Sequence, residues 1–203
     1  MNIIQIVAID RFLGIGKNNN ILFENRYDKK LFSSFTKEVC PVVICGRKTL
    51  ESLPNQELKD RDIIVITRKQ NYNTKYKVAN SIENAMLFAT QSDKYNGNIG
   101  IIGGGEIYEQ FLPYSDMLLV TSYAVYDAEA DAHYPKDFDL DYNKILDIPF
   151  PNDRVICNLS LYVNKKYKNR LDILNTFSGL SNIINDIIKS ADKNDIPNYQ
   201  YLL

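Results

Sequence analysis

Two glycine-bearing turns in this chain could hold an anionic ligand, because each follows an apolar, strand-like run and opens a helix-like one. They lie at residues 45–49 (CGRKT) and 102–106 (IGGGE). In open parallel sheets, ligands bind outside the carboxyl ends of the strands, where free helix N–H groups attract phosphate and glycine permits close approach. Neither turn has the spacing of a Rossmann fingerprint or a Walker A loop. Together they could hold a pyrophosphate, although either one alone is equally consistent with a plain tight turn.

Basic and hydroxyl side chains near these turns favour a phosphomonoester as part of the ligand. Arg47 and Lys48 open the helix after the first turn, and Thr67 and Arg68 follow the next apolar run. An arginine fork with a hydroxyl and a second cation suits the 2′-phosphate of NADP. The competing interpretation is a cluster of solvated surface charges.

One carboxylate, Asp28, lies in the first turn of a predicted helix whose apolar face carries Leu31, Phe32 and Phe35. At the mouth of an apolar pocket its pKa would be raised, and it could bind an amidine-like heterocycle edge through two hydrogen bonds. From its position alone, the stronger interpretation is an acid that stabilises the helix N-terminus through the macrodipole.

Strands that alternate with short helices must position these residues. Continuous apolar runs predict buried strands at 3–9, 41–45, 62–67, 99–102 and 118–123. Helices are predicted at 27–38, after 46, at 81–89 with Ser81 as N-cap, and at 106–112. Residues 10–20 and 68–77 are expected to be loops, and a late strand pair is expected near 145 and over 155–165. The pattern predicts an α/β fold with a central, mostly parallel β-sheet, an antiparallel C-terminal edge strand and helices on both faces.

The segment after about residue 170 has a different pattern. Over residues 181–191, an apolar stripe opposes polar side chains and predicts one amphipathic helix; its members are Ile183, Ile184, Ile187, Ile188 and Ala191. We therefore expect a domain over residues 1–167 and a C-terminal extension over 168–203. The stripe could fold back on its own domain or pair two copies into a homodimer, and we favour the first.

Composition excludes several classes of protein. With 24 basic and 25 acidic side chains the net charge is −1, which disfavours bulk binding of nucleic acid. The three cysteines, Cys40, Cys45 and Cys157, are too few and too widely spaced for a disulfide framework and fit a reducing, cytoplasmic compartment. His133 is the single histidine, so no metal site is expected. We also expect no signal peptide and no membrane association, because no apolar run approaches the roughly 20 residues of a membrane span.

The ordered motifs resemble the dihydrofolate reductase family over roughly residues 1–166. Residues 6–9 and 13–18 are similar to the first strand and the mobile active-site loop, and Asp28-x3-Phe32-x3-Thr36 is similar to the folate-binding helix. Further matches lie at 46–52, at Arg61 with 63–67, at 102–108 (IGGGEIY) and at 131–135. One such motif is weak, whereas the ordered set is specific.

The resemblance implies a reaction in which NADPH reduces 7,8-dihydrofolate to tetrahydrofolate. Hydride would pass from nicotinamide C4 to pterin C6, and water would carry a proton to N5. Asp28 would be the catalytic carboxylate that holds the pterin 2-amino and N3 edge, and Arg61 would pair with the α-carboxylate of the glutamate tail. The implied substrate-binding residues are Ile6, Val7, Phe32, Leu53, Arg61, Ile102 and Tyr108.

The resemblance also assigns a cofactor site. Residues 17–20 would belong to a loop that closes over the nicotinamide, and Arg47 and Arg68 would favour NADPH over NADH. Antifolate inhibitors become candidate ligands of the same pocket. The implied NADPH-binding residues are Ala8, Ile15, Gly16, Gly46, Arg47, Lys48, Thr49, Thr67, Arg68, Gly103, Gly104, Gly105, Glu106 and Ile107.

Four positions depart from the family pattern. Leu22 and Phe23 replace the usual proline and tryptophan of the active-site loop, and Leu50 replaces a common aromatic residue. Ala132 stands where we expect the threonine that hydrogen-bonds the pocket acid, so we expect Asp28 to lose about 1 kcal/mol of anchoring.

Two other functions stay open at this point. The pyrimidine reductase of riboflavin synthesis would share the glycine motif and the NADPH site, but it would not need the Asp28-x3-Phe32-x3-Thr36 helix. A non-catalytic folate-binding or structural protein could keep the fold, and the missing threonine, tryptophan and proline together with the extension favour it. Retention of Asp28 and Arg61 argues against that second alternative.

Overall fold

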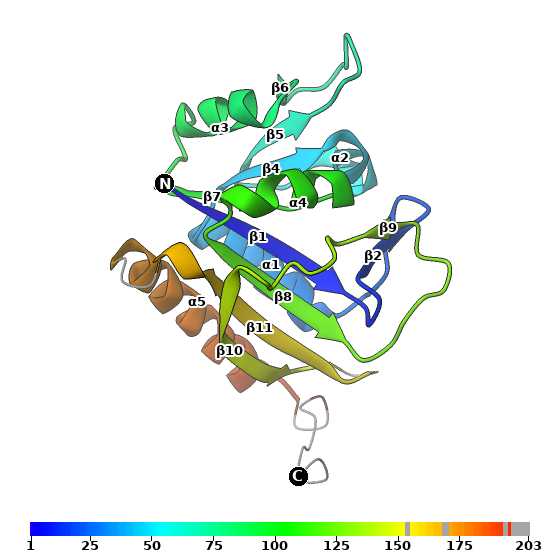
Figure 1. Cartoon of the computed structure of the whole chain (residues 1–203), viewed down its shortest axis with the longest axis vertical. Helices are drawn as coiled ribbons and strands as arrows, with labels where there is room; N and C mark the ends of the chain where they lie inside the picture. The colour runs from blue at the N-terminus through cyan, green and yellow to red at the C-terminus, as the bar shows by residue number, and fades with distance from the viewer. Residues whose placement is uncertain (153–154, 168–170, 193–194, 196–203) are drawn as a thin grey trace.

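The computed structural model of the chain describes residues 1–152, 155–167, 171–192 and 195, and places eight strands in one central sheet (Figure 1). The strand order is β10-β11-β8-β1-β7-β4-β5-β6. All pairs from β8 to β6 are parallel, whereas β11 is antiparallel to both β8 and β10. The predicted fold class is confirmed. The strands are β1 Asn2–Ile9, β4 Val42–Gly46, β5 Asp62–Ile66, β6 Lys77–Ala79, β7 Asn98–Ile101, β8 Met117–Tyr123, β10 Tyr142–Phe150 and β11 Cys157–Asn164.

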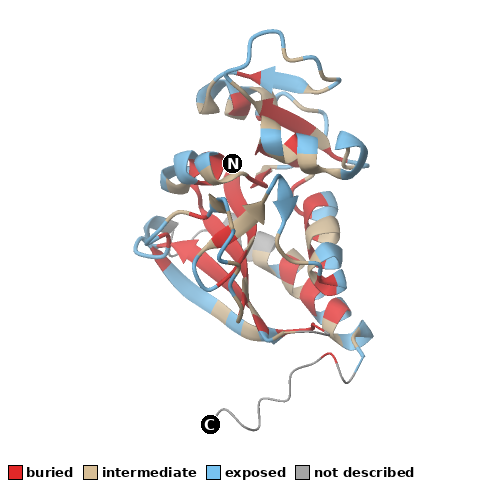
Figure 2. Ribbon diagram, turned by 90° about the vertical axis from the view of Figure 1, so that its right-hand side faces the viewer, coloured by how far each residue is buried: buried red, intermediate tan, exposed pale blue. Residues whose placement is uncertain are grey.

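Helices cover both faces of this sheet, because its central strands are apolar on both sides (Figure 2). On β1, Ile4 and Ile6 belong to a cluster with α1 and α5, whereas Ile3 and Val7 belong to a cluster with α3 and α4. The helices are α1 Arg26–Glu38, α2 Arg47–Ser52, α3 Ile82–Thr90, α4 Gly105–Phe111 and α5 Leu171–Ser190, with short 3-10 turns at Pro54–Gln56, Leu112–Tyr114 and Lys165–Tyr167.

Side-chain caps fix where two of the helices begin. Asn25 precedes α1, and its side-chain oxygen accepts a hydrogen bond from the Tyr27 N–H at 2.9 Å. Ser81 precedes α3, as expected, and accepts from the Asn84 N–H at 3.2 Å. Such caps satisfy N–H groups that have no partner inside the helix. The cap at Asn25 therefore sets the position of the first turn of α1, which contains Asp28.

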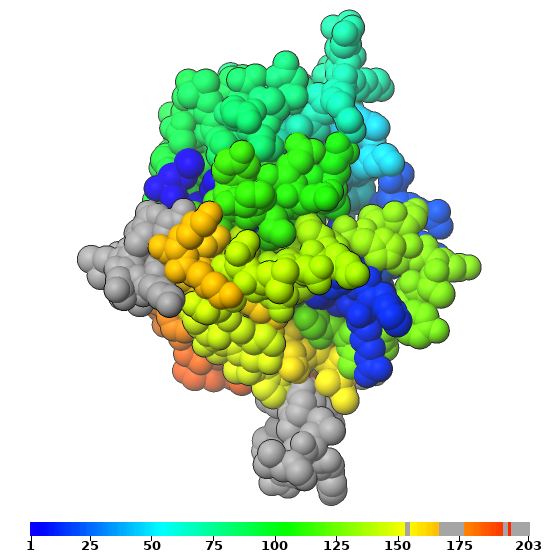
Figure 3. All heavy atoms as spheres, in the orientation of Figure 1, coloured from blue at the N-terminus to red at the C-terminus, as the bar shows by residue number. Residues whose placement is uncertain are grey.

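The prediction that residues 10–20 form only a loop was wrong. They contain β2 (Gly14–Lys17) and β3 (Asn20–Ile21), which join β9 (Ala132–His133) in a second, three-stranded sheet. Asn18 and Asn19 make the tight hairpin turn with φ of 51° and 60°, a backbone conformation that asparagine tolerates well. β9 comes more than 100 residues later, so its pairing leaves no local signal. Figure 3 shows the two segments side by side. Residue 77, also expected in a loop, begins the edge strand β6.

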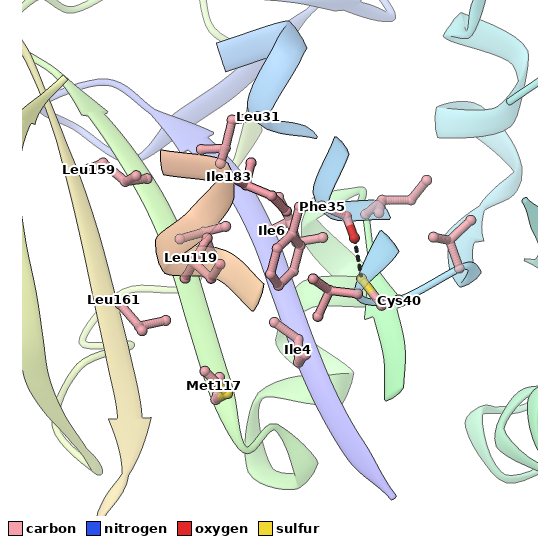
Figure 4. Close-up of a cluster of buried hydrophobic side chains, with 14 of the residues drawn as sticks. Ile4, Ile6, Leu31, Phe35, Cys40, Met117, Leu119, Leu159, Leu161 and Ile183 are labelled. Atoms are coloured by element: carbon pink, nitrogen blue, oxygen red, sulfur yellow. Dashed lines mark hydrogen bonds between the residues drawn. The ribbon is translucent and has the colours of Figure 1, made fainter. Parts of the chain in front are cut away.

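The C-terminal helix is longer than predicted and packs on the same chain. α5 begins at Leu171 rather than near 181. Leu180, Ile183, Ile184 and Ile187 are buried in the cluster that contains Leu31 and Phe35 of α1 (Figure 4). Burying each of these side chains stabilises the fold by about 1.5–3 kcal/mol. The stripe thus folds back on its own domain, while the boundary at residue 167 stays a prediction. None of the helices that the structure describes is long and apolar enough to cross a membrane.

Candidate active site

Asp28 is held by a hydroxyl from the sheet. It lies in the first turn of α1, and Thr121 Oγ1 of β8 donates a hydrogen bond to its Oδ1 at 2.6 Å. Burial raises the pKa of the Asp28 carboxyl, and the Thr121 hydrogen bond opposes that rise. One carboxylate oxygen thus has a fixed partner, while the carboxylate keeps acceptor sites for a ligand.

The expectation that Ala132 leaves Asp28 less anchored was wrong. Ala132 lies in β9, paired with Gly16 in the small sheet, and Thr121 provides the hydrogen bond instead. A sequence signal for Thr121 exists. It interrupts an apolar strand, and the period of two places its side chain on the same face as Leu119 and Tyr123, which belong to the cluster around α1.

The predicted pocket walls lie on both faces of the sheet. Ile6 and Ile102 are buried in the cluster around α1, with Phe32 and Leu53 packed against it. Val7 belongs to the opposite cluster, so its side chain lies on the other face from Asp28.

Tyr108 is buried in the same cluster as Val7, on the face of the sheet that α3 and α4 cover. Its hydroxyl donates to the Ile6 carbonyl oxygen at 2.6 Å, and its ring lies edge-on to Tyr134. Ile6 is one of the implied substrate-binding residues, and its carbonyl oxygen already has one partner, although it can accept a second hydrogen bond.

Arg61 is a buried cation with neutral partners. It is 9% exposed, and it donates to Thr36 Oγ1 at 2.7 Å and to the Lys59 carbonyl at 3.0 Å. Burial lowers the pKa of its guanidinium. Among the described residues, no carboxylate lies within ion-pair distance of Arg61. Its remaining N–H groups are therefore available to an anionic ligand, which suits the expected pairing with a carboxylate.

The structure brings the two glycine turns into direct contact. Gly46 N–H donates to the Gly103 carbonyl at 2.7 Å, so the carboxyl ends of β4 and β7 meet. Gly103 has φ of +122°, and Thr49 packs against it. A Cβ on Gly105 would lie 2.5 Å from the His133 carbonyl oxygen, a distance that no side chain tolerates. Gly104, Glu106 and Ile107 lie at the start of α4, so the two glycine turns and this helix start are adjacent, while their role in binding a pyrophosphate stays a prediction.

Of the predicted phosphate-binding cations, Arg68 is exposed and Arg47 is half-buried, and each pairs with a carboxylate. Arg68 Nη2 contacts the Glu106 carboxylate at 2.9 and 3.0 Å, and Arg47 Nη1 contacts Glu51 at 2.7 Å. Lys48 is exposed. Thr67 and Arg68 line a hollow of about 380 Å³ with a partly apolar floor that includes Val78, Ala79 and Phe88. Such a hollow suits a flat base with a phosphate at its rim.

The segment that resembles the family's active-site loop, residues 13–18, forms ion pairs with the chain around residue 127. Lys17 forms ion pairs with Asp127, at 3.3 Å, and with Glu129. Ile15 packs against the cluster around α4, Ala8 packs against the cluster around α1, and Gly16 pairs with Ile21.

Among the departures, Leu50 is fully buried and Phe23 stacks on Tyr123, with ring centroids 4.1 Å apart. Tyr123 was not singled out from the sequence. Its hydroxyl is buried, and burial together with the nearby Asp28 charge raises its pKa. The Asn25 side chain opposes that shift without completing a hydrogen bond. A tyrosine at the end of an apolar strand gave no signal in the sequence that it lies near Asp28.

Comparison with known proteins places these features in one family. Residues 2–157 match the family model described as dihydrofolate reductase. The dihydrofolate reductase of Staphylococcus haemolyticus is 35% identical over 136 residues, covering 66% of this chain and 77% of the relative. The viral dihydrofolate reductase of Saimiriine herpesvirus 2 is 30% identical over 186 residues and covers 85% of both chains. A solved dihydrofolate reductase from Enterococcus faecalis, complexed with NADP(H) and RAB-propyl, superposes with a TM-score of 0.71 at 25% identity, covering 81% of this chain and 96% of that one.

Proposed function

This chain belongs to the dihydrofolate reductase family, whose reaction is the NADPH-dependent reduction of 7,8-dihydrofolate to 5,6,7,8-tetrahydrofolate, and we propose that the site around Asp28 carries it out here. The hydrogen bond between Thr121 and Asp28 carries this proposal. It fixes a single carboxylate against an otherwise apolar wall of Ile6, Phe32 and Ile102. That arrangement suits a flat heterocycle with an amidine-like edge.

Two polar groups of the chain would orient the substrate. Asp28 accepts hydrogen bonds from the 2-amino and N3 edge of the pterin, and the ionised form of Asp28 raises the basicity of N5. Arg61 binds the α-carboxylate of the glutamate tail, with its guanidinium held by Thr36. Both groups are positioned before substrate arrives, so less freedom is lost on binding.

The residues present fit the cofactor. The turns at Gly46 and Gly103 meet with no side chain between them, and the hollow beside Thr67 and Arg68 suits the adenine end. Gly104, Gly105 and Thr49 would lie along the pyrophosphate, and Arg68 would bind the 2′-phosphate. NADPH supplies the hydride when bound. Tyr108 and Ile102 would exclude water from the reacting face, and a water molecule beside Asp28 would deliver the proton to pterin N5.

We further propose that the enzyme acts as a cytoplasmic monomer and that antifolates compete for Asp28. Support for the monomer is the burial of Ile183, Ile184 and Ile187 against the chain's own α1, which leaves this part of the stripe unavailable to a second copy. The three cysteines are buried free thiols, as a reducing compartment favours.

Oxidation of NADPH in the presence of dihydrofolate tests the function. The wild-type chain should convert dihydrofolate and should leave the aminopyrimidine substrate of riboflavin synthesis unchanged. Asp28→Asn should lose at least about 100-fold in kcat/KM for dihydrofolate, as expected for a group that both binds and promotes proton transfer. Asp93→Asn, an exposed aspartate in a distant loop, is the matched control and should keep wild-type activity. Equal turnover in Asp28→Asn and wild type would exclude this mechanism.

A further inference from the structure

The segment that follows α5 reaches back to the helix that carries Asp28. Arg26 Nη2 lies 2.6 Å from Asp192 Oδ2 and 2.6 Å from Asp195 Oδ2. The Tyr27 hydroxyl donates to Asp195 Oδ2 at 2.7 Å. Residues 26 and 27 directly precede Asp28, so Asp192 and Asp195 contact the first turn of α1 next to the pocket carboxylate.

The two aspartates differ in burial, although both contact the same arginine. The Asp192 side chain is 72% exposed and that of Asp195 only 12% exposed. The Tyr27 and Arg26 contacts hold the pKa of the Asp195 carboxyl below its usual value. An exposed ion pair contributes little, whereas a buried carboxylate with a charged and a hydroxyl donor has a defined geometry. Asp195 is therefore the stronger constraint, and Asp192 is a natural control.

Asp195 also connects α1 to the chain between β10 and β11. Its carbonyl oxygen accepts from the Asn152 N–H at 2.8 Å. The neighbouring Pro151 carbonyl accepts from Asn25 Nδ2 at 3.0 Å, and Asn25 is the N-cap of α1. The cap, the first turn and this connection therefore form one hydrogen-bonded unit, and Asp195 lies at its centre.

We propose that Asp195 is a positioning residue for Asp28: it fixes the first turn of α1 so that the pocket carboxylate meets both Thr121 and the substrate. This inference rests on the proposed function of the Asp28 site. The contact of 2.6 Å between Thr121 and Asp28 leaves little tolerance for movement of the turn. The C-terminal segment thus contributes to substrate binding without touching the substrate.

The cofactor side of the molecule offers an internal reference. Most of the proposed NADPH residues lie in α2, just after β5 and at the start of α4. The contacts of Asp195 with Arg26, Tyr27, Asn152 and Asp192 do not reach them. Loss of positioning should therefore weaken dihydrofolate binding and leave NADPH binding unchanged. Simple destabilisation of the fold would instead reduce the amount of active enzyme and change neither KM.

Steady-state kinetics of the full chain test the proposal. Asp195→Asn should raise the KM for dihydrofolate about five- to tenfold, with the KM for NADPH within about twofold of wild type, as expected when a charged hydrogen bond is removed behind the binding group. Asp192→Asn should match wild type in both constants. Tyr27→Phe removes only a hydroxyl and should reproduce the Asp195→Asn effect. The double variant should show less than the sum of the two effects, because both substitutions weaken the hydrogen bond between Tyr27 and Asp195.

Folate binding measured by calorimetry provides a readout that does not need turnover. If the wild-type chain has no reductase activity, the proposed function is refuted. The ratio of folate affinities between wild type and Asp195→Asn would still test whether Asp195 positions Asp28. Positioning is overturned if Asp195→Asn and Tyr27→Phe keep wild-type folate affinity and KM for dihydrofolate. It is equally overturned if the constants for both ligands change by the same factor. Melting temperatures of all variants identify any that fail to fold.

Discussion

The proposed substrate half and the proposed cofactor half of the site use charge in opposite ways. On the substrate half, Arg61 is 9% exposed and Thr121 is 2% exposed, and their partners Thr36 and Asp28 are already in place. On the cofactor half, the Arg68 side chain is 84% exposed and pairs with the exposed Glu106. Buried groups are preorganised and costly to disturb, whereas exposed ion pairs exchange readily with solvent and ligand. Substitutions on the substrate half should therefore have the larger effects.

After Asp28 itself, the largest effect is expected at Arg61. Arg61→Leu should raise the KM for dihydrofolate by about tenfold or more, because the α-carboxylate of the substrate would lose its cationic partner. The KM for NADPH should stay unchanged. Steady-state kinetics with each substrate varied in turn measure both constants, and Lys136→Met, which removes one exposed positive charge, is the control. Equal increases in the KM values for dihydrofolate and NADPH would contradict a separate substrate half and cofactor half.

A smaller effect, visible mainly in the pH profile, is expected at Thr121. Thr121→Val removes the hydrogen bond that lowers the pKa of Asp28, so that pKa rises further above its ordinary value. Because ionised Asp28 binds the pterin edge, the acid limb of kcat/KM for dihydrofolate should move to higher pH. Thr121→Ser keeps a hydroxyl and should retain the wild-type profile. If the pH profile of kcat/KM in Thr121→Val matches that of wild type, Thr121 does not set the pKa of Asp28 during the reaction.

Asp28 should also reduce stability at neutral pH. Burial raises the pKa of Asp28 in the folded state. The free energy of unfolding therefore has its full contribution from Asp28 below the unfolded pKa of about 3.9. That contribution is lost as pH rises through the folded-state pKa. Asp28→Asn should therefore raise the melting temperature by a few degrees at neutral pH and by less in acid. Thermal melts at two pH values measure this difference. An identical shift at both would mean that ionisation of Asp28 is not the cause.

The smallest effects are expected on the cofactor half. Arg68→Gln should raise the KM for NADPH by about three- to fivefold and leave that for NADH unchanged, since only the phosphorylated cofactor uses the cation. Glu106→Gln releases Arg68 from its pair and should lower the KM for NADPH slightly. Added salt should weaken NADPH binding more than folate binding, because exposed charges are screened more strongly. Equal salt dependence of NADPH and folate binding would contradict the difference between buried charges on the substrate half and exposed charges on the cofactor half.

The elements that the sequence predicted best are encoded locally. The apolar run of β1 and the Ser81 cap of α3 each need only a few neighbouring residues, and the structure contains both. The small sheet was missed because β9 pairs with β2 across more than 100 residues. The polar anchor of the C-terminal segment was missed for a similar reason, since Asp195 and Tyr27 meet only in the folded chain.

The pocket shows how motif order can mislead at a single position. The order of motifs directed attention to Ala132, whereas strand alternation on β8 would have selected Thr121. The type of chemistry was predictable from Asp28, Arg61 and the glycine turns. The contact between Gly46 and Gly103 and the burial of Arg61 required the tertiary structure.

Calorimetric titration of Asp28→Asn with folate and, separately, with NADPH tests the central claim most directly. If Asp28 organises the substrate half alone, folate affinity should fall by at least about tenfold, while NADPH affinity stays within about twofold of wild type. Unchanged folate affinity, or a parallel loss for both ligands, would contradict the assignment of Asp28 as the carboxylate of the pterin pocket.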